Sequence, residues 1–275
     1  MNMNRKLPVP RSGNYLQFPL CALAYGKSEN DRLNAIISYG LVETGKVFWS
    51  RITDTQRAGY LNNPSVLGSV PNDFDPRNSL HIAALLGARV IGITIYSAVR
   101  EVAEHQALRQ FFDKFQAQNG SDALVRLRRD FVFEARDGKG MTPRELAVLA
   151  AIYSVIGKKQ RPVRITRETI KLRALGYKTK EIARRELPRR SDGAQPLTEW
   201  KLRCTIDSLA ARKFFCRSTF GRRETFYTNR MDEAEFRAAL VALKTRRSAF
   251  KQTQRRKDEN LTNTIRKLRR KPESQ

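Results

Sequence analysis

Met141-Thr142-Pro143-Arg144-Glu145-Leu146 marks the start of a helix more clearly than any other stretch of the chain. Thr142 is suited to the N-cap, and Pro143 to the first helical position, where its missing N–H costs nothing. Glu145 stands three residues after the cap and can accept from the cap N–H, which completes a capping box. Apolar residues then recur at helical spacing, and they are Leu146, Leu149, Ala150, Tyr153 and Ile156.

Shorter elements are expected directly after this helix. Val163-Arg164-Ile165 has the composition of a short strand. Thr166 predicts the start of a second helix that ends at Gly176, and Thr179 predicts a third that ends at Pro188.

A second strong helix signal begins at Thr198, which is expected to cap a helix from Glu199 to Lys213. Its apolar stripe is Leu202, Ile206 and Leu209, and the expected opposite side holds Lys201, Thr205, Ser208 and Arg212. Two β-rich runs follow, 214–220 and 224–228, joined by Gly221-Arg222-Arg223. A Gly-containing link between two such runs predicts a hairpin with a basic tip.

This order of helices, capped helix and hairpin resembles a winged-helix domain, a helix-turn-helix variant that binds mainly duplex DNA. The resemblance covers residues 141–229, about a third of the chain, and departs from the group in a long loop, 187–197. It implies that the helix from Thr198 is the recognition helix and that the hairpin is the wing.

The remaining chain predicts a mainly α protein in four parts. Residues 1–13 are expected to be a flexible basic arm, and 14–136 a helical domain with helices from Ser28, over Tyr96–Gln118 and over Asp122–Glu134. Asp137-Gly138-Lys139-Gly140 reads as the boundary before the winged-helix-like domain at 141–229. Residues 230–275 are expected to form a basic helical tail.

The charge balance points to a polyanionic partner. The chain has 53 Lys and Arg against 27 Asp and Glu, a formal net charge of +26. Residues 1–140 hold 18 basic and 13 acidic residues, whereas residues 141–275 hold 35 and 14. Most of the excess therefore lies on the winged-helix-like segment and the tail.

The cysteines and histidines do not suggest a metal or a cofactor. Cys21, Cys204 and Cys216 have no metal-ligand spacing, and the chain has two histidines. An odd number of cysteines among apolar residues is typical of buried thiols in a reducing cytosol. No signal peptide or membrane span is evident, so a cytoplasmic protein is expected.

Catalytic patterns are also missing. His105 lies among charged residues and is expected at the surface, and His81 is expected to be a helix-end or packing residue. Asp73 and Asp75 fit a turn better than a metal site. Tyr227 is a conceivable strand-cleaving nucleophile, but its place beside Phe226 favours packing. The sequence therefore predicts a protein that is not an enzyme.

The candidate DNA contacts follow from the resemblance and from the basic side chains. Lys201 and Arg203 are expected in the groove and Thr205 at a nearby base or phosphate, while Trp200 fits either the core or a contact. Thr198 offers helix-start N–H groups to a phosphate. The hairpin tip and the long loop supply the remaining candidates, Arg222, Arg223, Arg189 and Arg190.

Double-stranded DNA is the expected partner, and sequence-specific transcription regulation is the expected role. Initiation of plasmid or phage replication is one alternative, and an RNA-binding or ribonucleoprotein role is another. Residues 14–136 are expected to dimerise, to bind a protein partner or to hold a second DNA contact.

Overall fold

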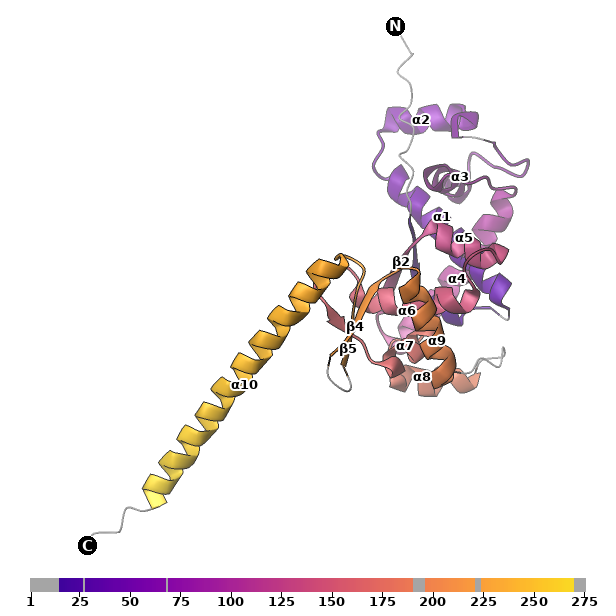
Figure 1. Cartoon of the computed structure of the whole chain (residues 1–275). Coiled ribbons are helices and arrows are strands. Elements are labelled where there is room, and N and C mark those ends of the chain that lie inside the picture. Colours follow the sequence, from indigo (N-terminus) through magenta and orange to yellow (C-terminus); the bar gives the residue numbers. More distant parts are fainter. Residues whose placement is uncertain (1–14, 27, 68, 190–195, 221–223, 270–275) are drawn as a thin grey trace.

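The computed structural model describes residues 15–26, 28–67, 69–189, 196–220 and 224–269. The protein is mainly helical and has two small antiparallel sheets, one in each half of the chain (Figure 1). The expectation of a mainly α fold is confirmed at this level.

The N-terminal half consists of helices around a two-stranded sheet. Ser28 caps its first long helix and accepts from the Asp31 N–H at 3.1 Å, as expected. The region 50–78, rich in turn residues, contains a short helix with a capping box formed by Thr53 and Gln56. The elements are β1 (Tyr15–Pro19), η1 (Leu20–Ala24), α1 (Glu29–Trp49), α2 (Asp54–Asn62), η2 (Pro64–Leu67), α3 (Ser79–Ile91), α4 (Ala98–Asn119), β2 (Leu124–Arg128) and α5 (Arg129–Asp137).

The predicted helix over Asp122–Glu134 is wrong in its first half, which is strand β2. Val125 and Leu127 are fully buried, whereas Leu124, Arg126 and Arg128 alternate with them on the exposed face. This period of two is the pattern of a half-buried strand. Pairing with β1 stabilises the strand, with Leu16 opposite Leu127, and a local sequence window cannot reveal that partner.

Helices α1 and α3 cross so closely that two glycines are required. A Cβ on Gly45 would lie 1.8 Å from the Ala83 carbonyl oxygen, and one on Gly87 would lie 1.9 Å from the Leu41 carbonyl oxygen. Both positions therefore serve backbone contact between helices.

The C-terminal half begins with α6, and its predicted capping box is confirmed. The Glu145 N–H donates to Thr142 Oγ1 at 3.2 Å, and the Thr142 N–H donates to Glu145 Oε2 at 2.9 Å. Thr166, Thr179 and Thr198 cap the next three helices as expected. The elements are α6 (Pro143–Ile156), β3 (Val163–Arg164), α7 (Arg167–Ala174), α8 (Lys180–Glu186), η3 (Leu187–Arg189), α9 (Glu199–Ala211), β4 (Cys216–Phe220), β5 (Glu224–Thr228) and α10 (Glu233–Arg269).

Strand β5 lies at the centre of the second sheet, whose order is β3-β5-β4. Val163 pairs with Tyr227, and Cys216 pairs with Thr228, both in antiparallel register. The chain turns from α9 into β4 at Lys213, which has a φ of 59°. That left-handed conformation is uncommon outside glycine, so the turn places a small strain at the end of α9.

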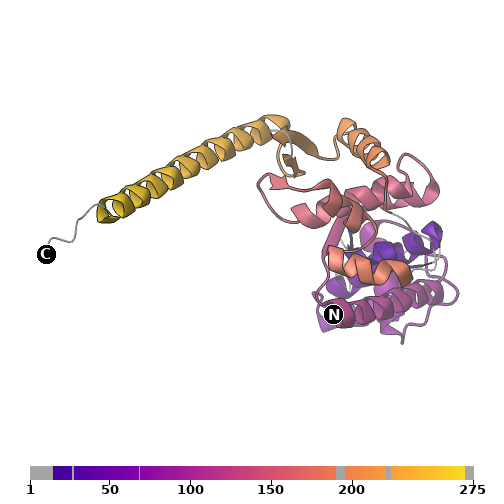
Figure 2. The same ribbon diagram turned by 90° about the horizontal axis from the view of Figure 1, so that it is seen from below.

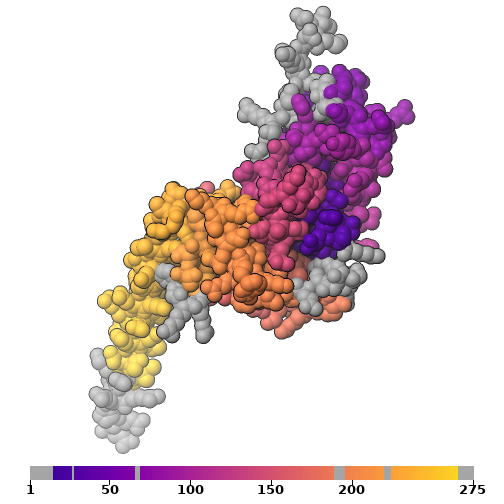
Figure 3. Space-filling model, turned by 45° about the vertical axis from the view of Figure 1, so that its right-hand side comes forward, coloured from indigo at the N-terminus to yellow at the C-terminus, as the bar shows by residue number. Residues whose placement is uncertain are grey.

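The buried cluster runs without a break across the expected boundary at Asp137–Gly140, from Leu16 to Tyr227. Helix α6 lies inside it, in contact with β2 and α5 on one side and with α7 and α9 on the other. Figure 3 shows the N-terminal and C-terminal halves of the chain in direct contact with each other. Seven side chains of α6 are exposed by 1% or less, namely Leu146, Val148, Leu149, Ala150, Ala151, Ile152 and Ile156.

Helix α10 projects away from this body (Figures 1 and 2). Its 37 residues span about 55 Å at the usual rise. Phe236 and Leu240 pack against Phe226 of β5, and every described side chain from Lys244 to Ile265 is exposed. None of the described helices combines the length and apolar character that crossing a membrane requires.

Candidate nucleic-acid interface

Helix α9 is held in a fixed orientation by its apolar side. Leu202, Ile206 and Leu209 are exposed by 2% or less, so the stripe expected from the sequence is confirmed. At the start of the helix, Thr198 Oγ1 accepts from the Lys201 N–H at 3.3 Å and fixes the first turn. The exposed side of α9 therefore has a defined direction relative to the rest of the body.

The first two turns of α9 present an aromatic and two basic side chains to solvent. Trp200 is 72% exposed, which excludes it from the core. Lys201 and Arg203 are also exposed. Among the described residues no carboxylate pairs with Lys201, and Arg203 lies at 3.9 Å from Asp207, one turn further along α9.

The expectation that Thr205 lies on the side of α9 opposite the apolar stripe is wrong. Thr205 is 7% exposed, and its hydroxyl donates to the Lys201 carbonyl at 2.8 Å. It lies three residues after Leu202 and one before Ile206, so the buried face is wider than the three-residue stripe suggested.

The other basic candidates cannot be placed. Arg190, Arg222 and Arg223, and the side chain of Arg189, lie outside the part of the chain that the structure describes.

Two basic residues of α7 join the interface and were missed from the sequence. Arg167 and Lys171 lie one turn apart and contact Glu199 at 2.5 and 2.9 Å. Hydrogen bonds from Lys171 and Arg167 lower the pKa of Glu199. The signal was their i, i+4 spacing, which puts both on one face of α7, but their proximity to the start of α9 depends on the fold.

The other end of α9 is tied to α6 through Glu145. Its Oε1 accepts from the Ser208 hydroxyl at 2.8 Å and lies 3.3 Å from Arg212. Burial raises the pKa of Glu145, but hydrogen bonds from Thr142 and Ser208 outweigh it, so the pKa is lowered. One carboxylate thus caps α6 and anchors α9. On β4, Arg217 adds a 2.6 Å ion pair to Asp207 of α9.

Helix α10 carries a long basic segment, whose side chains are exposed from Lys244 to Ile265. Residues 244–269 contain ten Lys and Arg against two acidic residues. Arg247 pairs with Glu224 of β5 at 2.5 Å, near the last point where α10 contacts the body. Beyond that point the described side chains form no packed face.

Residues with catalytic potential have structural roles. His105 was expected at the surface, but it is 3% exposed, stacks on Tyr39 at 5.4 Å between ring centroids, and lies 2.9 Å from Glu43. The long α4 helix faces α1 there, and the charged neighbours of His105 in the sequence hid that contact. Tyr227 packs against Phe215 at 5.5 Å and is 2% exposed, so the expectation of packing is confirmed.

The aspartates of the 71–78 turn also have structural partners. Asp73 accepts from the Ala98 N–H at 2.8 Å and so helps to begin α4. The Asp75 N–H donates to Nδ1 of His81 at 3.0 Å. The described residues contain no group of three or more His, Cys, Asp and Glu side chains that could hold a metal ion.

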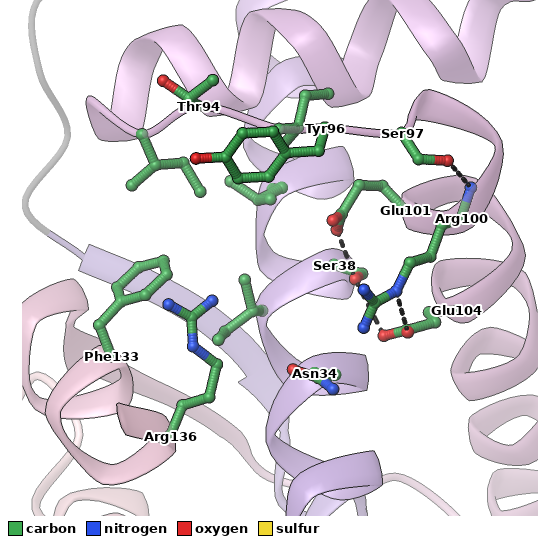
Figure 4. Close-up of a pocket in the computed structure, with 14 residues that line it drawn as sticks. Asn34, Ser38, Thr94, Tyr96, Ser97, Arg100, Glu101, Glu104, Phe133 and Arg136 are labelled. Carbon is green, nitrogen blue, oxygen red and sulfur yellow. Dashed lines mark hydrogen bonds and ion pairs between the residues drawn. The ribbon is translucent and has the colours of Figure 1, made fainter. Parts of the chain in front are cut away.

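A pocket of about 410 Å³ lies between α1, α4 and α5 (Figure 4). Ser38 donates to Glu101 at 2.6 Å, and Arg100 donates to Glu104 at 3.1 Å. Burial raises the pKa of Glu101 above its ordinary value. These polar groups bond to one another, and the pocket contains none of the residues that the sequence marked as DNA contacts.

Comparison with known proteins identifies no relative of the chain. No protein-family model matches the chain, and neither a curated protein nor a solved structure matches it.

Proposed function

We propose that the protein is a non-catalytic duplex-DNA-binding protein and that residues 141–229 form a winged-helix domain. The order α6, β3, α7, α9, β4, β5 supports this, because a winged helix places its first strand beside a C-terminal hairpin in the same way. The sheet order β3-β5-β4 is consistent with it. Helices α8 and η3 then form an insertion before the recognition helix.

The exposed, capped start of α9 is the observation that carries the proposal. The major groove of B-DNA admits one α-helix, whose N-terminal residues reach the base edges. In α9 that position holds Trp200, Lys201 and Arg203, on a helix oriented by Leu202 and Leu209. A fixed orientation is needed for base reading because a bond to a base edge tolerates little misplacement.

The other basic residues would supply affinity. Each phosphate neutralised by Lys or Arg releases counterions, whatever the sequence of the duplex. Arg167 and Lys171 flank the start of α9, and α10 extends the basic surface beyond the body. We infer that the protein finds a specific duplex site through α9 and acts there as a transcription regulator.

Selection of bound sequences from random duplexes by the full chain tests this proposal. A common site should emerge, and affinity for it should fall steeply with salt, with a log–log slope of about −0.9 per phosphate contact. Competition with single-stranded DNA and RNA should leave the selected duplex preferred. Failure to enrich any site, or a flat salt response, would contradict the proposal.

A further inference from the structure

The outer face of the N-terminal sheet carries an unusual combination of side chains. Leu16 and Val125 are fully buried beneath it, so their neighbours along each strand face solvent. On that face the Arg126 guanidinium lies 4.5 Å from the centroid of the Tyr15 ring, which is 44% exposed. The opposite partner of Tyr15 in the register is Arg128, on the same face.

Contacts between arginines and aromatic rings continue from the sheet to the end of α9. Arg128 lies over the Phe131 ring at 5.3 Å, and Phe131 meets Phe214 edge to face at 4.7 Å. Arg212 then lies over Phe214 at 4.7 Å. We name these residues the arginine–aromatic strip, namely Tyr15, Arg126, Arg128, Phe131, Arg212 and Phe214.

The strip keeps a positive charge and is accessible. Arg128 pairs with Asp130 at 2.8 Å and Arg212 with Glu145 at 3.3 Å, yet their side chains remain 52% and 34% exposed. No carboxylate of the described residues pairs with Arg126. Contact with the rings restricts the guanidinium groups and reduces the entropy they lose when a ligand binds.

We propose that the arginine–aromatic strip binds a single-stranded nucleic acid. Unpaired bases stack on aromatic rings and on guanidinium planes, and their phosphates pair with the same arginines. A duplex keeps its bases stacked on one another and could use the strip through its phosphates alone. The alternation of arginines and aromatic rings therefore fits a single strand better than a duplex.

This surface is separate from the proposed duplex contact. Arg212 follows the last turn of α9, whereas Trp200 and Lys201 lie in its first turn, so roughly 15–20 Å of helix separates them. One molecule would then hold duplex through the start of α9 and an unpaired strand through the strip. The strip would therefore add an unpaired strand to the ligands of the duplex-binding protein proposed above.

Fluorescence anisotropy of the full chain with a labelled oligothymidylate of about 12 nucleotides tests the proposal, a length that single-strand-binding modules cover. The double variant Tyr15→Ala, Arg126→Ala should weaken binding about tenfold or more, since it removes one stacking platform. The control is Arg136→Ala, because Arg136 also stacks on a ring, that of Phe133 at 4.8 Å, but lies outside the strip. It should change the affinity by less than about twofold.

The outcomes separate this proposal from the duplex proposal. Lys201→Ala, Arg203→Ala should lose duplex binding and keep single-strand binding, whereas the strip variant should do the reverse. If binding of an oligouridylate is weakened by the strip variant to the same extent, the strip is a single-strand site that also accepts RNA. Unchanged oligonucleotide affinity in the strip variant, or an equal loss in the Arg136→Ala control, would overturn the proposal whatever the duplex result.

Discussion

Helices α9 and α10 both expose basic side chains, but they differ in what holds them. Helix α9 buries Leu202, Ile206 and Leu209, and ion pairs or hydrogen bonds attach both of its ends to α7 and α6. Helix α10 is packed at Phe236 and Leu240 and then leaves the body. The difference separates two tasks, because reading a base requires a fixed side chain, whereas attracting phosphates requires charge alone.

The largest effect expected concerns the support beneath α9. Helix α6 is buried between the two halves of the chain, so a fragment of residues 141–250 would expose one apolar side of it. We expect this fragment to lack a cooperative unfolding transition in urea, followed by circular dichroism, while the full chain shows one. A sharp transition in the fragment would mean that α9 is positioned by the C-terminal half alone.

Single substitutions should change the free energy of unfolding very differently in α9 and in α10. Leu209→Ala should lower the free energy of unfolding by roughly 2–5 kcal/mol because it leaves a cavity beneath α9. Phe250→Ala in α10 removes a side chain that is 71% exposed. This substitution should change the free energy of unfolding by less than about 0.5 kcal/mol. Urea titrations of both variants make the comparison. A comparable decrease in Phe250→Ala would show that α10 is packed against something in solution.

The carboxylate that anchors α9 predicts a pH dependence. Hydrogen bonds lower the pKa of Glu145 in the folded protein, so its contribution is present above the unfolded pKa and is lost as the pH falls through the folded one. Glu145→Gln should therefore cost about 1–3 kcal/mol at pH 7, and progressively less below about pH 4. Urea midpoints of both proteins from pH 3 to pH 7 measure the effect. A constant difference across that range would exclude the charge as the cause.

Removal of residues 251–275 should have the smallest structural effect. The described side chains of this segment are exposed, so the melting temperature should stay the same. Affinity should fall by the same factor on a selected duplex and on a scrambled one, and the salt slope should shrink by about 0.9 for each phosphate that the tail neutralises in the full chain. A change in sequence preference would make α10 a reader of bases.

Local signals in the sequence were sufficient for much of the fold. The caps at Ser28, Thr142 and Thr198 and the stripe of Leu202, Ile206 and Leu209 depend on residues a few positions apart, and all are confirmed. Tertiary contacts account for the errors. Strand β2 exists because β1 pairs with it, and His105 is buried because α4 faces α1.

The candidate site was predictable to a similar extent. Exposure of Lys201 and Arg203 follows from helical periodicity on one element. Thr205 was misplaced because the buried face of α9 depends on how many elements cover it. The approach of Arg167 and Lys171 to Glu199, and the strip that joins β2 to Phe214, combine residues more than twenty positions apart. No single-element pattern carries that information.

Titration of the double variant Lys201→Ala, Arg203→Ala on a selected duplex and on a scrambled one tests the central claim most directly. A matched control is Arg255→Ala, Arg256→Ala, which removes two exposed charges from α10. If α9 reads bases, its variant should lose roughly 1–3 kcal/mol per base contact on the selected site and less on the scrambled duplex, while the control weakens both equally. Equal losses on both duplexes in the α9 variant would contradict the account and make the protein a general nucleic-acid binder.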